Sequence, residues 1–210
     1  MGAPLRCLRG AIGVLLLLAC AAGAPEHAQP PASDTSFGPS GFLGDYSELR
    51  ARAGSPARLV YLDPAVDFSR YERVIVEPVV VWKSDEDRFA GISPAQREAL
   101  AREFQAEFER AFAQEFAIAG GDAGPGTLRA RSALTAAIAV PGRSDPERLQ
   151  YVAVELEFLD AVTNQRLAAA VDSKAQVDAK AAFGEWADRA AARVAALRDV
   201  DRQPRQPETP

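Results

Sequence analysis

The chain has little of the chemistry that most enzymes and metal sites need. Its 210 residues include one histidine and two cysteines, which excludes most catalytic triads, thiol proteases and metal sites with His or Cys ligands. Basic residues are outnumbered, with 24 Lys and Arg against 29 Asp and Glu and a net charge of −5. Nucleic-acid binding needs a basic face, so this balance argues against it. With 48% hydrophobic residues, the composition is that of a globular chain.

Residues 1–24 have the features of a secretory signal peptide. Arg6 and Arg9 make the start positive, and a nine-residue apolar run follows at positions 11–19. That run is too short for a membrane-spanning helix, which needs about 20 apolar residues. It fits the hydrophobic region of a signal peptide, so we expect the protein to be exported.

This region ends in the sequence LLAC at positions 17–20, which resembles the lipobox of bacterial lipoproteins. The resemblance implies that residues 1–19 are removed and that Cys20 is acylated. Acyl chains anchor a protein durably, since each buried methylene contributes about 0.8 kcal/mol. Ala21 after the cysteine implies the periplasmic face of the outer membrane. The alternative is cleavage after Ala24, which would leave a soluble secreted protein.

Composition divides the remainder into a tether, a body and a tail. Residues 20–40 begin with the cysteine and are rich in Ala, Pro, Gly, Ser and Thr, typical of a flexible tether, and His27 lies within it. Residues 41–198 form the body, which is long enough to bury the core of one domain. Residues 199–210 contain three prolines among polar residues and are expected to be disordered.

The first half of the body predicts a strand followed by a helix. Residues 71–82 are β-branched and apolar on both faces, typical of a central strand, in which Pro78 predicts a bulge or a locally unpaired edge. Ser93 and Gln96 have the spacing of a capping box, which predicts a helix that runs to about residue 118. An apolar stripe along this helix is expected to pack on the sheet: Leu100, Phe104, Phe108, Phe112 and Phe116.

The second half predicts three strands and a helix. Alternating apolar residues predict strands over 128–140 and 151–159, and a turn at 160–165 leads to a return strand over 166–172. An amphipathic helix is predicted over 179–198. The inward face of the first of these strands is expected to hold Leu128, Ala130, Leu134, Ala136, Ile138 and Val140.

These elements define an α+β fold. After an N-terminal arm with a short strand at 58–62, the order is β-α-β-β-β-α. We expect a mixed sheet of four or five strands with both amphipathic helices packed on one face. The helical crossover should join parallel strands, and the later hairpins should be antiparallel.

Three carboxylates near the end of a predicted strand are candidates for chemistry. Glu155 and Glu157 share one face of the strand, and Asp160 follows. Such carboxylates can serve as acid and base in glycoside hydrolysis. The favoured interpretation is a solvated charged face, on which Arg129 and Arg131 of the neighbouring strand pair with the glutamates.

The segment at residues 41–49 joins the tether to the body but carries large apolar side chains. Phe42, Leu43, Tyr46 and Leu49 lie within it, together with Asp45. The favoured interpretation is that the aromatic residues pack on the domain. The alternative is that these five residues form a docking segment for another envelope protein.

Several stretches together resemble a family of bacterial lipoproteins catalogued as domain of unknown function 3313. The resemblance covers residues 20–198, and it implies an envelope lipoprotein without adding an activity. Asn164-Gln165 stands where the family is expected to have Gly-Glu, a change that the turn should absorb. Besides the lipobox, the resemblance depends on SGFL at 40–43, DYS at 45–47, VIVEPVVVW at 74–82, WAD at 186–188, and Tyr61, Pro64, Tyr71, Glu155, Glu157, Asp160 and Thr163.

The sequence therefore favours an outer-membrane lipoprotein that acts as a non-catalytic accessory or binding module for an envelope protein complex, with no cofactor and no metal. The order of elements also looks like that of accessory lipoproteins that activate peptidoglycan synthases or assist transport complexes. Two alternatives stay open. One is a hydrolase of envelope glycans that uses Glu155, Glu157 or Asp160. The other is a carrier of a small ligand or lipid, which would require an apolar cavity between helices and sheet.

Overall fold

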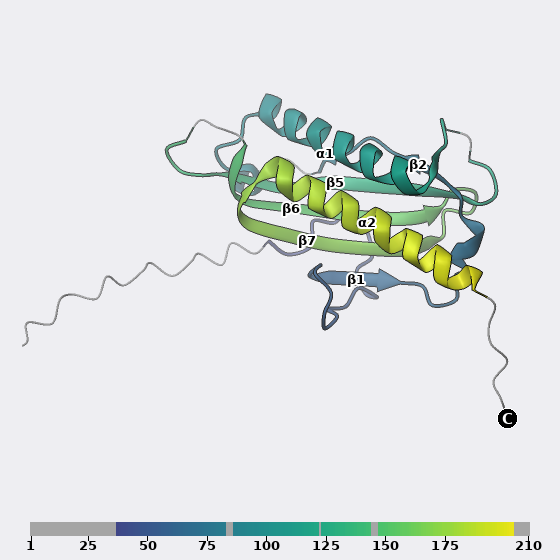
Figure 1. Ribbon diagram of the computed structural model, residues 1–210. Coiled ribbons are helices and arrows are strands. Elements are labelled where there is room, and N and C mark those ends of the chain that lie inside the picture. Colours follow the sequence, from purple (N-terminus) through teal and green to yellow (C-terminus); the bar gives the residue numbers. More distant parts are fainter. Residues whose placement is uncertain (1–36, 83–85, 122, 144–146, 204–210) are drawn as a thin grey trace, which may run out of the picture. The chain divides into compact units, whose positions relative to one another are not determined.

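The computed structural model describes residues 37–82, 86–121, 123–143 and 147–203. The predicted signal peptide, Cys20 and most of the tether therefore lie outside the described residues. Two long helices lie on one face of a seven-stranded mixed sheet (Figure 1). The α+β class is confirmed, but the sheet has more strands than the expected four or five.

The sheet has the strand order β1-β7-β6-β5-β2-β4. β3 also pairs with β5, further along that strand than the part that pairs with β2. The predicted hairpins are confirmed as a long antiparallel meander of β5, β6 and β7. β2 and β3 both run parallel to β5, as the helical crossover requires. The strands are β1 (Leu59–Leu62), β2 (Arg73–Val76), β3 (Val80–Val81), β4 (Ala117–Ile118), β5 (Thr127–Ala139), β6 (Arg148–Asp160) and β7 (Arg166–Asp178).

Pro78 divides the predicted strand over 71–82 into β2 and β3. Val76 of β2 pairs with Ala130, and the pairing resumes with Val80 opposite Ala133. One extra residue therefore lies in the divided strand, as expected for a proline that cannot donate to the ladder. The strand is also not central, because beyond β2 the sheet continues only with the two-residue β4.

Both helices begin at the predicted positions. Ser93 and Gln96 form the capping box of α1 (Pro94–Glu115), and Asp178 caps α2 (Ala179–Arg202). Two short 3₁₀ helices, η1 (Phe68–Arg70) and η2 (Glu86–Phe89), complete the elements. α2 continues four residues past the predicted boundary at 198, and Asp201 near its end accepts a hydrogen bond from the backbone N–H of Phe68. Residues 204–210 of the predicted tail lie outside the described part.

The core between the helices and the sheet is aromatic. All five residues of the predicted α1 stripe are buried. Phe104 of this stripe stacks on Phe183 of α2 with ring centroids 5.0 Å apart, which brings the two helices together over the sheet. Aromatic pairs of this kind contribute about 0.5–1.5 kcal/mol beyond the burial of their area.

A β-bulge at Thr135 changes which residues of β5 face the helices. Leu134 pairs with Val154, but the next pair is Ala136 with Ala153, so that Thr135 has no partner across the ladder. The bulge reverses the alternation: Ala137 joins the helix-facing core, whereas Ala136 and Ile138 lie with Tyr151 on the other face. The prediction that Ala136 and Ile138 share the face of Leu128 is therefore wrong.

Candidate functional site

The sheet face opposite the helices is covered by the N-terminal arm, defined here as residues 40–50. Phe42, Leu43 and Leu49 are buried against Ala133, Ala169 and Val171 of the sheet. The aromatic residues of the segment therefore pack on the domain, as the favoured interpretation predicted. The side chains of Phe42, Leu43 and Leu49 are covered in this arrangement, so that of the five residues considered for docking only Asp45 is exposed and Tyr46 partly exposed.

Glu155 of β6 binds the arm to the sheet through hydrogen bonds. Its side chain is 1% exposed, and its carboxylate accepts hydrogen bonds from the backbone N–H of Ser40 at 2.7 Å and from the hydroxyl of Tyr46. The Tyr46 oxygen in turn accepts from the backbone N–H groups of Gly41 and Leu43. Burial and the bond to Glu155 raise the pKa of Tyr46. This buried carboxylate therefore organises the backbone of the arm.

Glu157 has the same role through two arginines. It is 3% exposed and pairs with Arg131 at 2.6 Å and with Arg166 at 2.9 Å. Arg166 also donates to the backbone carbonyl oxygens of Leu43 and Asp45. The expected pairing of Arg131 with a glutamate is present, but the expectation of a solvated face is wrong, because the arm covers both glutamates.

Arg129 does not pair with the glutamates of β6. Its guanidinium lies 3.3 Å from Glu77 and donates to the side chain of Asn164. Asn164 has a φ of 60°, which is the left-handed conformation expected for this turn.

Asp160 closes the turn after β6. Its carboxylate accepts a hydrogen bond from the hydroxyl of Tyr71 at 2.9 Å and from the backbone N–H groups of Val162 and Thr163. Burial disfavours the ionised form of Asp160, but the bonds from Thr163, Tyr71 and Val162 outweigh it and lower the pKa of this carboxyl. Burial and the same bond raise the pKa of Tyr71 to about 12. All three candidate carboxylates therefore accept hydrogen bonds that fix the fold.

Replacing Tyr71 by phenylalanine is expected to lower the free energy of unfolding by about 2 kcal/mol at pH 7, since it removes a hydrogen bond to a charged group. A carboxyl whose pKa is lowered on folding stabilises the protein above its ordinary pKa of 3.8, and this stabilisation is lost as the pH falls through the lowered value. The difference between the two proteins should therefore shrink below pH 3.8. Urea unfolding from neutral to acidic pH measures it, and a constant difference would contradict the assignment.

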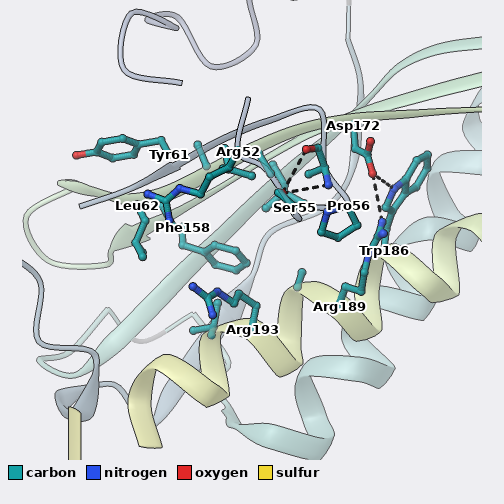
Figure 2. A pocket seen from close by; sticks show the side chains of 18 of the residues that line it. Arg52, Ser55, Pro56, Tyr61, Leu62, Phe158, Asp172, Trp186, Arg189 and Arg193 are labelled. Carbon is teal, nitrogen blue, oxygen red and sulfur yellow. Dashed lines mark hydrogen bonds and ion pairs between the residues drawn. The ribbon is translucent and has the colours of Figure 1, made fainter. Parts of the chain in front are cut away.

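A separate feature is an apolar pocket of about 480 Å³, called here the α2 pocket. It lies between α2, the helix-facing side of β6, β7 and β1, and the loop at residues 52–57 (Figure 2). Its volume falls within the range of about 300–1,000 Å³ typical of small-molecule sites. None of the three carboxylates lines it. Its apolar wall includes Val60, Leu62, Leu156, Phe158, Val194 and Leu197.

Small residues explain why this part of the core is hollow. Ala168 and Ala170 of β7 face the helices, and Ala190 of α2 lies on the opposite wall. Between α1 and the sheet, by contrast, phenylalanine side chains fill the core. This pocket was not predicted from the sequence. The available signal was the pair of alanines at alternate positions of β7, where β6 carries Phe158 and Leu156 at the paired helix-facing positions.

The charged lining of the pocket is mainly basic. Arg52, Arg189 and Arg193 line it together with one acidic residue, Asp172, for a sum of +2. Asp172 is buried and accepts hydrogen bonds from the indole N–H of Trp186 at 2.7 Å and from Arg189 at 3.2 Å (Figure 2). Arg52 and Arg193 are exposed, and neither guanidinium group has a hydrogen bond or ion pair with any described residue.

Within the described ranges, no cluster of three or more His, Cys, Asp or Glu side chains could hold a metal ion. No helix there has the length and hydrophobicity needed to cross a membrane.

Comparison with known proteins assigns the chain to a family. Residues 38–200 match the family described as protein of unknown function DUF3313, and the chain belongs to this family. No curated protein matches it in sequence.

Solved structures with low similarity include two from bacteria. PelC of Paraburkholderia phytofirmans, crystallised as a dodecamer, is 13% identical over 66% of this chain and 95% of its own, with a TM-score of 0.39. The Xanthomonas campestris protein XCC0632, of family DUF330, is 10% identical over 68% of this chain and 94% of its own, with a TM-score of 0.40.

Proposed function

We propose that the protein is a lipid-anchored envelope protein whose domain is a non-catalytic binding module for an apolar ligand. The α2 pocket is the observation that carries this proposal, because it supplies the cavity between helices and sheet that a carrier requires. Apolar side chains from β1, β6 and α2 surround it, and loop residues 52–57 cover part of it (Figure 2). The carrier hypothesis is therefore favoured over docking by the arm.

The glycan hydrolase is the less favoured alternative. Glu155 accepts bonds from the arm, Glu157 pairs with two arginines, and Asp160 holds the turn. A catalytic acid and base have to face a substrate across a shared cleft. Because these carboxylates bind the protein itself, their arrangement supports a structural role.

Anchoring through Cys20 is the other part of the proposal and depends on the lipobox. Replacing Cys20 by alanine removes the thiol that would be acylated, so the protein should move from the membrane fraction to the soluble periplasmic fraction. Separation of inner membrane, outer membrane and periplasm, followed by immunodetection, measures this shift. Continued sedimentation of the Cys20→Ala protein with the outer membrane would contradict the anchor.

Ligand binding can be tested with the Cys20→Ala protein, which carries no lipid of its own. Aminoanthracene is a neutral apolar fluorophore that brightens in a dry environment. We expect saturable binding with one site per chain, because the α2 pocket is lined mainly by apolar side chains, whereas a second pocket of about 440 Å³ between the arm and the sheet is lined mainly by polar and charged ones. A signal that rises without saturation, or no signal, would contradict the proposed function.

A further inference from the structure

We infer that the α2 pocket takes a single-chain lipid with an anionic head group, and that Arg52 and Arg193 bind this head group. The inference rests on the proposed function and specifies the ligand class. It depends on the charge and position of the two arginines at the pocket, together with the pocket volume.

The charge of the pocket is opposite to that of the chain. The whole sequence carries −5, whereas the residues lining the pocket sum to +2. Arg189 is already engaged by Asp172 and by Glu185 at 3.2 Å. This leaves Arg52 and Arg193 as the cations of the lining that have no acidic partner among the described residues.

The two arginines come from different elements. Arg52 belongs to the loop that covers the pocket, and Arg193 belongs to α2. In the view of Figure 2 their side chains lie on either side of Phe158, at the same end of the pocket and away from Asp172. An acyl chain packed on Phe158 would therefore place its head group within reach of both arginines.

Guanidinium groups match carboxylate and phosphate oxygens with paired, charge-assisted hydrogen bonds. Both head groups share this chemistry, so the arginines select anionic lipids over neutral and cationic ones. The volume of about 480 Å³ lies in the lower half of the range for small-molecule pockets. This favours one acyl chain over two.

The test compares four probes that share a twelve-carbon chain: laurate, dodecyl phosphate, dodecanol and dodecyltrimethylammonium. Each probe is titrated, below its own critical micelle concentration, into the complex of aminoanthracene with the Cys20→Ala protein. The loss of fluorescence as the probe displaces aminoanthracene gives the affinity of the probe. We expect at least one of the two anions to bind about tenfold more tightly than dodecanol, as one charge-assisted contact predicts. Comparison of the carboxylate with the phosphate identifies the head group.

The variant Arg52→Gln/Arg193→Gln should remove this preference, so that the anions bind it no more tightly than dodecanol does. Arg58→Gln/Arg102→Gln is the matched control, because it removes the same charge from exposed positions that do not line the pocket. Equal binding of anions and dodecanol to the unsubstituted pocket, or a preference that survives the first variant, would overturn the inference. In both cases the proposed function stands, whereas it fails if the fluorophore does not bind at all.

Discussion

Replacing Glu155 by alanine is expected to lower the free energy of unfolding by about 3 kcal/mol and to release the N-terminal arm from the sheet. The carboxylate is 1% exposed and binds both Ser40 and Tyr46. Its removal leaves the buried N–H of Ser40 and the partly buried hydroxyl of Tyr46 without this acceptor, and each loses a hydrogen bond to a charged group. Phe42 should then leave its contact with Trp82, whose ring lies 5.5 Å away.

Two measurements test the effect of the Glu155→Ala substitution. Urea denaturation gives the loss in stability, and limited proteolysis shows whether the arm has become cleavable while the rest of the domain resists. Glu48→Ala is the matched control, because Glu48 lies exposed on the same arm and should change neither result. A Glu155→Ala protein with unchanged stability and a protected arm would show that the carboxylate does not hold the arm.

Replacing Ala170 by leucine is expected to weaken aminoanthracene binding at least about tenfold without destabilising the domain. Ala170 lies on β7 between Val60 and Leu156 and lines the α2 pocket. A leucine there extends into empty space, so it removes volume from the ligand site while it adds apolar contacts to the wall. Fluorescence titration measures the affinity, and thermal unfolding checks the fold.

The matched control is Ala175→Leu, the same substitution at an exposed position of the same strand. Ala190→Leu is an independent test from the opposite wall of the pocket, with the exposed Ala192→Leu as its own control on α2. Both wall variants should weaken binding and both controls should retain it. Binding that is unchanged in stably folded Ala170→Leu and Ala190→Leu proteins would place the fluorophore elsewhere.

The elements of the fold could be predicted where a local pattern determines them. The capping box at Ser93 and the stripe of phenylalanines place α1 and its buried face, because both depend only on residues close in sequence. The division of strand 71–82 follows in the same way from the missing N–H of Pro78. The bulge at Thr135 could not be predicted, since it depends on how β5 pairs with β6 rather than on its own sequence.

The candidate site was harder to predict because its features depend on distant contacts. Glu155 and Glu157 alternate with apolar residues as a solvated face would, and their burial requires an arm more than 100 positions away in the chain. Likewise, the α2 pocket depends on Ala168 and Ala170 of β7, which lie across the pocket from Ala190 of α2. In a sequence rich in alanine these positions look like any others, and only the pairing of strands and the path of α2 bring them together.

Native mass spectrometry of the Cys20→Ala protein, purified gently from the periplasm of its producing cells, tests the central claim most directly. We predict a noncovalent complex whose added mass is that of one anionic single-chain lipid, and we predict that the Ala170→Leu protein prepared in parallel lacks it. Only the ligand-free mass, or the same added mass on both proteins, would contradict the account of a ligand held in the α2 pocket.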